Sequence, residues 1–217
     1  GVLRKMTREG NTLSAVLRLA WDGAPIHIMT KANPMTASEY HVSCIFHGVE
    51  GEISRRFSED HIEGGLGNRI LWVKVDRSQK LAMPPSQPSE FQLLVDEYQS
   101  AYSRALSIYK PDVALKLSST ALGQWTSVYD ALSDDRSTDF LDRMTTRAET
   151  YVLKLALLYA VLDSATEIRS DHLDAGLAVW EYCEQSVSMI FGQRVGTTLT
   201  HRLEEAIDQS EQKMLPR

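Results

Sequence analysis

The sequence predicts two parts of different fold class: an α/β part that supplies the later strands of a sheet, followed by an all-α helical bundle. Three observations support this division. Up to residue 82, short apolar runs of β type alternate with helical patterns. Prolines at positions 84, 85 and 88 then stop both helix and strand. Beyond them, apolar residues recur at spacings of three and four, which is typical of packed helices.

The first part is predicted to contain two helices and three strands. In chain order, these are a helix over 13–20 that Asn11 or Thr12 caps and Gly23 ends, strands over 25–30 and 40–46, a short helix over 51–57, and a strand over 70–75. The second strand ends at His47, and ligands of open α/β sheets bind at this end of the strands. The spacing of these elements indicates the later half of an α/β sheet.

The second part is predicted to be helical, with a short extended piece near Leu115 and Leu117. Its helices cover 89–108, 119–132, 149–162, 170–190 and 199–212, and Thr146 with Glu149 has the spacing of a capping box. The first helix has an apolar face formed by Phe91, Leu94, Val95, Tyr98, Tyr102, Ala105 and Ile108. The helix after Ser170 has one formed by Leu173, Leu177, Trp180, Cys183, Val187 and Ile190. Both faces are expected to be buried.

Composition is that of an ordinary globular protein of 217 residues, 43% of them hydrophobic and 24% charged. No apolar run approaches the roughly 20 residues that a membrane span needs, so no membrane partner is expected. No secretory or transit segment is expected at the start of the chain. Cys44 and Cys183 lack the spacing of a metal or redox motif. They are interpreted as reduced core residues, which predicts a cytoplasmic location.

Charge is distributed unevenly along the chain. The net charge of −6 argues against a protein that binds nucleic acid through bulk charge. Residues 1–80 carry 11 Lys and Arg against 9 Asp and Glu, whereas residues 81–217 carry 12 against 20. Phosphate contacts are therefore expected in the first part. Arg55 and Arg56 are candidates for contact with DNA there, and a solvated surface is the alternative.

Arg69 follows a glycine-rich turn that begins at Gly64 and leads directly into the predicted strand over 70–75. Gly65 and Gly67 let the backbone take positive φ and approach a ligand closely, so an arginine on the rim of the turn is presented. Such an arginine suits a phosphate contact made to a neighbouring subunit. The alternative is a plain turn whose arginine caps the sheet edge. If Arg69 is buried in an internal salt bridge, this phosphate-contact role is to be dropped.

Several motifs in fixed order resemble one family. They are the run Arg8 to Ser14 with Trp21-Asp22-Gly23, then His47, then Asn68-Arg69 before a Leu-Trp-Val strand, and the segment from Arg147 to Asp163. Together they cover most of the chain. They resemble the C-terminal part of the ATPase domain of primase-helicase proteins from phages, prophages, plasmids and other mobile elements, a family largely of uncharacterised function. That domain is similar to the hexameric plasmid helicase RepA, a P-loop ATPase of the RecA-like or AAA+ group.

The resemblance implies roles for individual residues. His47 corresponds to the position that senses the γ-phosphate or orients the attacking water, and Arg69 to an arginine finger that reaches the nucleotide of the adjacent subunit. Arg147 corresponds to a sensor arginine at the start of a lid helix. A cation at the start of a helix opposes the helix dipole, so its presence there indicates a nearby anion. The alternative is an ordinary exposed arginine, since such residues also occupy first turns of helices. The residues expected to line the nucleotide are Asn68, Gly65 and Gly67.

The nucleotide-binding half of such an ATPase is not found in this sequence, which contains neither GxxxxGK[ST] nor an apolar strand ending in paired acids. ATP and Mg²⁺ are thus expected cofactors of the full-length protein that this chain does not hold alone. The expected partners are further copies in a ring, a hexamer in the full protein, and single-stranded DNA. The expected domains are the C-terminal portion of the ATPase core (1–82), a linker (83–88), a lid-like helical domain (89–195) and the start of a truncated further domain (196–217).

Two hypotheses of different class remain open. The first is a fragment of a DNA-dependent ATPase of the replicative helicase type, inactive on its own. The second is a non-enzymatic helical interaction module from a mobile-element replication protein, whose α/β part is a remnant. The six histidines show no metal-binding spacing, so no metal site is expected.

Overall fold

The computed structural model divides the chain into two compact units. Unit 1 comprises residues 1–72, 136–146 and 185–217, and unit 2 comprises residues 73–135 and 147–184. The predicted linker lies outside the described residues, so the predicted domain limits stay predictions. The described residues are 12–28, 34–57, 61–62, 64–77, 80, 82, 90–109, 114–133 and 140–214, without the side chains of residues 28, 90 and 193–214.

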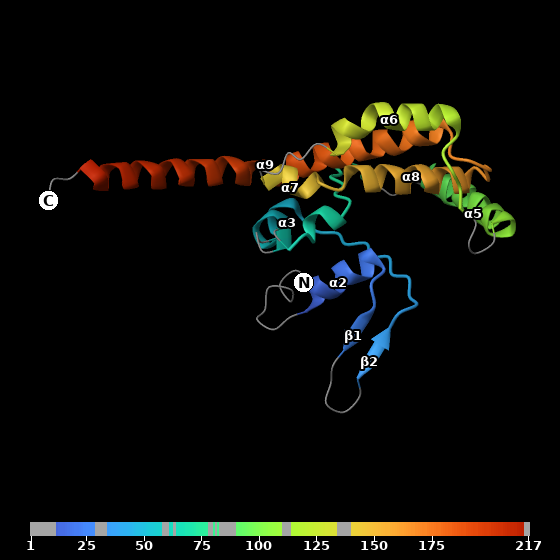
Figure 1. Ribbon diagram of the computed structural model, residues 1–217, viewed down its shortest axis with the longest axis horizontal. Helices are drawn as coiled ribbons and strands as arrows, with labels where there is room; N and C mark the ends of the chain where they lie inside the picture. Colours follow the sequence, from blue (N-terminus) through green and yellow to red (C-terminus); the bar gives the residue numbers. More distant parts are fainter. Residues whose placement is uncertain are drawn as a thin grey trace. The chain divides into compact units, whose positions relative to one another are not determined.

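Unit 1 combines short elements from the first third of the chain with two later helical segments (Figure 1). Its elements are α2 (Leu13–Asp22), β1 (Ile26–Ile28), β2 (Met35–Ala37), α3 (Glu50–Arg56), the 3₁₀ helix η1 (Gly67–Arg69), α7 (Phe140–Thr145) and the part of α9 (Ser170–Met214) that follows Glu184. The helix α2 ends as predicted, because Gly23 takes a φ of 68° and the Ala24 N–H donates to the Leu19 carbonyl at 2.9 Å.

Two of the three predicted strands do not form. Residues 40–49 and 70–77, all of them described, have no regular structure. The predicted strand over 25–30 was correct in part, since β1 lies within it. β1 pairs antiparallel with β2, which lies between the first two predicted strands, where no strand was expected. A β-type sequence needs a neighbouring strand to satisfy its N–H and C=O groups. Within the described residues, the sheet is limited to this hairpin.

The core of unit 1 is aromatic. Trp72 packs edge-on against Phe57 and Phe191, with ring centroids 5.1 and 5.0 Å apart, and Phe140 lies 5.9 Å from Phe191. The indole N–H of Trp72 donates to the Gly67 carbonyl at 3.1 Å, so the buried polar atom is satisfied. These contacts join the turn before residue 72 to α7 and α9. The cluster consists of Phe57, Ile62, Leu66, Trp72, Phe140, Met144, Val187, Ile190 and Phe191.

Unit 2 is helical, as predicted. It contains α5 (Glu90–Ile108), α6 (Ser119–Ser133), α8 (Ala148–Leu162) and α9 up to Glu184, and α5 and α6 each contact α8. A parallel bridge joins Leu117 to Ile168 and confirms the short extended piece. None of the helices in the described part of the chain has both the length and the apolar character required to cross a bilayer.

Two details of the helical part were predicted wrongly. The helix α9 continues from residue 170 to 214, where two separate helices were expected. The capping box at Thr146 does not form: Arg147 takes the N-cap position of α8, and no described side chain caps this turn. The Thr146 hydroxyl instead accepts a hydrogen bond from the Asn68 amide at 2.8 Å, within unit 1. A long-range partner has replaced the local one.

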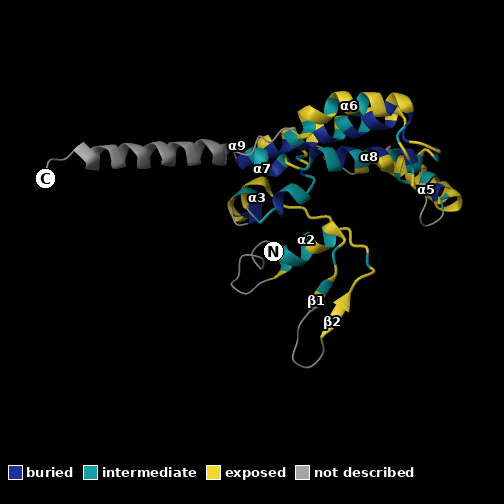
Figure 2. Ribbon diagram, viewed as in Figure 1, coloured by how far each residue is buried: buried dark blue, intermediate teal, exposed yellow. Residues whose placement is uncertain are grey.

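The predicted apolar faces of α9 and α5 have opposite outcomes (Figure 2). On α9, Leu173, Trp180, Cys183, Val187 and Ile190 are buried, which confirms that prediction. On α5, only Ala105 is buried, and Phe91, Leu94, Tyr98, Tyr102 and Ile108 are at least half exposed. Periodicity identifies an apolar face but does not supply the surface that covers it.

Gly176 brings α9 against α8 in unit 2. A Cβ atom at this position would lie 2.8 Å from the Val152 carbonyl oxygen and 3.2 Å from the Ala156 nitrogen, both of them backbone atoms. We therefore expect Gly176→Ala to lower the free energy of unfolding by about 1–3 kcal/mol, as overpacking does. Gly123 in α6 is the control, because a Cβ there meets nothing within 4 Å. Gly123→Ala should raise stability through helix propensity. Equal effects in urea denaturation would contradict the close packing at Gly176.

Candidate functional site

The glycine turn before Arg69 is anchored in the core of unit 1. The Gly65 N–H donates to the Ile62 carbonyl and the Leu66 N–H to the His61 carbonyl, both at 2.8 Å. Gly65 takes a φ of 74°, a conformation that favours glycine. Leu66 and Gly67 are buried, and η1 begins at Gly67. The turn is thus a fixed support that carries Asn68 and Arg69 at its half-buried rim.

Arg69 forms an ion pair with Asp22, the last residue of α2. Its Nη2 donates to the two carboxylate oxygens at 2.8 and 3.1 Å, and its Nε donates to Oδ1 at 3.2 Å. Its Nη1 donates to the Gly65 carbonyl at 2.7 Å, and its Cζ lies 5.5 Å from the centroid of the Trp21 ring. The Arg69 side chain is 12% exposed and that of Asp22 is 38% exposed. The guanidinium is therefore largely enclosed, and Asp22 is the more exposed member of the pair.

A second arginine joins the same two elements. Arg18, one turn before Asp22 on α2, donates to the Gly64 carbonyl. The glycine turn is thus held against α2 by Arg18 and Arg69, while Asn68 holds it to Thr146 next to α7. Sequence reasoning treated Trp21-Asp22-Gly23 as a helix end and missed the role of Asp22. A carboxylate at the negative end of a helix was the available signal, since such a position calls for a cation nearby.

This ion pair counts against a free arginine finger. Arg69 would have to exchange Asp22 for a phosphate before it could contact a nucleotide. The pair is only partly solvated, with Arg69 12% exposed, so its exchange for a phosphate would cost more than that of a fully exposed pair, which contributes about 0–1 kcal/mol. Asn68 and Gly65, expected to line a nucleotide, instead engage Thr146 and Arg69, and Gly67 packs against Met144 and Phe57. Their contacts with nucleotide stay predictions.

The other predicted site residues lie on different segments of the chain from the Arg69–Asp22 pair and the glycine turn. His47 is exposed in the irregular segment 40–49, because the strand that would carry it to a sheet edge does not form. Arg147 belongs to unit 2, half-buried at the start of α8. On α3, Arg55 donates to the Gly51 carbonyl at 2.7 Å, and Arg56 pairs with Glu52 at 3.1 Å. Both arginines are exposed, so DNA contact there stays a prediction.

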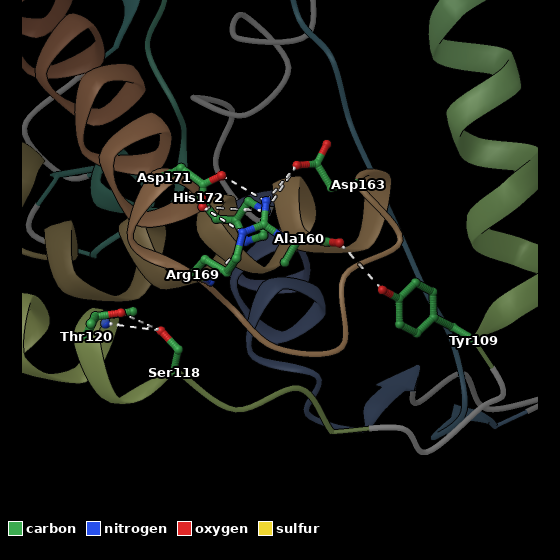
Figure 3. A network of polar contacts seen from close by, with 9 residues as sticks. Tyr109, Ser118, Thr120, Ala160, Asp163, Arg169, Asp171 and His172 are labelled. Atoms are coloured by element: carbon green, nitrogen blue, oxygen red, sulfur yellow. Dashed lines mark hydrogen bonds and ion pairs between the residues drawn. The ribbon is translucent and has the colours of Figure 1, made fainter.

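Unit 2 contains a polar cluster that sequence reasoning missed (Figure 3). Asp163, Asp171 and His172 place possible ligand atoms within 4.8 Å of one another. Arg169 shares this cluster and donates to Asp171 at 2.8 Å and to Asp163 at 3.3 Å. The hydrogen bond to Asp171 raises the pKa of Arg169, and the same bond lowers the pKa of Asp171. A guanidinium among these carboxylates opposes a metal cation.

His172 gives the cluster a structural role. Its Nδ1 accepts the backbone N–H of Arg169 at 3.1 Å, and its Nε2 lies 3.1 Å from an Asp163 oxygen. This geometry assigns the proton to Nε2, which donates to Asp163. A side chain that accepts the N–H of a residue three positions earlier caps the first turn of a helix, here α9. The cluster thus fixes the start of α9 with both ring nitrogens engaged. A histidine three residues after the N-cap is the sequence signal.

Comparison of the chain with protein families, curated proteins and solved structures finds no match.

Proposed function

We propose that this chain is the C-terminal part of an ATPase domain of the replicative helicase type, whose nucleotide-binding half lies outside it. The observation that carries the proposal is the exposure of apolar side chains on the two segments predicted to be strands. Ile45 is 95% exposed and Val75 is 79% exposed. Val42, Phe46 and Val73 are more than half exposed. Apolar runs of this kind are typical of strands buried within a sheet.

Strand partners supplied from outside the chain would account for this exposure. Buried apolar area contributes about 25 cal/mol per Å², so extended apolar segments gain stability when they join a sheet whose two faces are covered by helices. Segments 40–46 and 70–75 follow β1 and the glycine turn in the order that the resemblance implies. In a completed RecA-like or AAA+ sheet, 40–46 would bring His47 to the strand end beside the nucleotide, and 70–75 would follow Arg69.

The proposed activity is ATP hydrolysis coupled to DNA, in a ring of identical subunits. The P-loop of one subunit would hold ATP and Mg²⁺, and Arg69 of the next would stabilise the charge that develops on the transferred phosphoryl group. His47 would orient water, and Arg147 would contact the nucleotide from the helical part. This chain would thus contribute residues to the ATP site, and the P-loop would come from the half that lies outside it.

The exposed face of α5 supports a second candidate, a helical module that binds another protein. Phe91 is 72% exposed, and the stacked rings of Tyr98 and Tyr102 are about half exposed. Exposed apolar surface of this kind marks interaction sites. A module of this class would bind its partner without dependence on nucleotide, which the ATPase proposal does not predict.

The cysteines of the chain offer a direct test of the proposal. Cys183 is buried in unit 2 as predicted, whereas the predicted core position of Cys44 was wrong, because Cys44 is exposed in the segment 40–46. In the isolated chain, a thiol reagent should modify Cys44 rapidly and Cys183 slowly. In a longer protein that contains the chain and a P-loop half, Cys44 should become at least about tenfold slower, because a buried thiol must wait for the sheet to open. Cys183 should be unchanged. Equal Cys44 rates in the two proteins, or no ATPase activity in the longer one, would reject the proposal.

A further inference from the structure

We propose that Asp22 competes with a phosphate group for Arg69, an inference that rests on the function proposed above. The Asp22 carboxylate presents two oxygens to the guanidinium, and Nη2 contacts both while Nε contacts one. A phosphate offers a similar pair of oxygens in the same fork geometry. Asp22 therefore occupies the edge of Arg69 that a bidentate phosphate would take.

The helix α2 does not itself need a carboxylate at this position. Asp22 is its last residue, where the backbone carbonyls already make the helix end negative. The last turn of α2 contains no basic residue, and Gly23 with Ala24 ends the helix through backbone hydrogen bonds. Arg69 is the cation in contact with this carboxylate. The location of Asp22 is thus explained by Arg69 rather than by the helix.

If a phosphate replaced Asp22 as the partner of Arg69, the Asp22 carboxylate would move and the Arg69 side chain would stay in place. Asp22 is the more exposed member of the pair, and solvated ion pairs are weak and screened by salt. A terminal phosphate carries a charge of about −1.5 to −2, compared with −1 for the carboxylate. The Gly65 carbonyl at 2.7 Å and the Trp21 ring would still support the guanidinium after Asp22 has left. Gly65 and Trp21 thus hold Arg69 in an orientation suited to an incoming phosphate.

Inorganic triphosphate is the probe, titrated calorimetrically at low ionic strength into this chain and its variants. Asp22→Asn removes the competing charge and should bind triphosphate roughly fivefold more tightly than the wild type. Adding Arg69→Ala to Asp22→Asn should abolish the gain. Asp96→Asn is the matched control: it makes the same charge change at an exposed carboxylate of α5 that accepts a hydrogen bond from the Gln92 amide, and it should not increase the affinity. Thermal unfolding is recorded for each variant, and Asp22→Ser replaces Asp22→Asn if the amide variant is unfolded at the titration temperature.

Three outcomes would overturn the competition: no triphosphate binding by any variant, equal affinity of Asp22→Asn and wild type, or a gain that persists without Arg69. The titration involves no hydrolysis, so it separates this inference from the proposed function. A gain that depends on Arg69 in a chain whose completed form lacks ATPase activity would support the competition and reject the ATPase. An active ATPase that depends on Arg69, with no gain in Asp22→Asn, would reject the competition alone.

Discussion

Replacing Phe191 with alanine is expected to lower the free energy of unfolding of unit 1 by about 3–5 kcal/mol, the usual cost of removing a buried aromatic ring. Phe191 is fully buried on α9 and contacts Trp72, Phe140 and Phe57, with ring centroids 5.0–6.1 Å apart. Its loss would leave a cavity among three rings that come from separate parts of the sequence. Trp72 fluorescence in urea, measured with the other three tryptophans replaced by phenylalanine, reports this unit directly.

Met189 provides the matched control, because it lies two residues earlier on the same helix and is more than half exposed. Met189→Ala also shortens a long apolar side chain, and alanine and methionine have similar helix propensity. Its effect should stay within about 0.5 kcal/mol, as at most surface positions. A cost at Met189 equal to that at Phe191 would mean that the cluster around Trp72 is not the core of unit 1.

The helical part was predictable because helix periodicity encodes burial within a single segment. Leu173, Trp180, Val187 and Ile190 recur at helical spacing, and each is buried in α9. Pattern alone could not show that α5 leaves its apolar face exposed, because covering a face requires another element. The six-residue helix α7 was not predicted, and the contacts that hold it lie far away in sequence, including the core cluster of unit 1.

The strands and the Arg69 cluster show the other limit of sequence reasoning. Segments 40–46 and 70–75 have β-type composition, yet a strand forms only where a neighbour pairs with its backbone. Arg69 was predicted to be presented on the rim of the glycine turn, but its side chain is only 12% exposed and pairs with Asp22, which lies 47 residues earlier. No local spacing predicts a contact of that range. The enclosure of Arg69 by Asp22, Gly65 and Trp21 therefore had to come from the fold.

Under the proposed function, Arg69→Ala should lower the kcat of the completed ATPase by about 10³, the lower end of the range for arginine fingers. The affinity for ATP should change little, because the P-loop holds the ground-state nucleotide. Arg104→Ala is the control, since Arg104 is an exposed arginine on α5 with no predicted contact to nucleotide or DNA. Its kcat should stay within about twofold of the wild type, as expected for a surface position.

The ion pair with Asp22 gives Arg69→Ala a second, structural effect, so loss of activity alone does not identify a finger. Mixed rings separate the two effects. One subunit type carries Arg69→Ala with an intact P-loop, and the other has Arg69 but lacks the P-loop lysine. If Arg69 acts on the neighbouring nucleotide, the second type supplies the missing arginine and mixing restores ATPase activity to two inactive proteins. If Arg69 only fixes the glycine turn to α2, each subunit keeps its own defect and the mixture stays inactive. An inactive mixture of rings shown to contain both types would therefore leave Arg69 as an internal clamp.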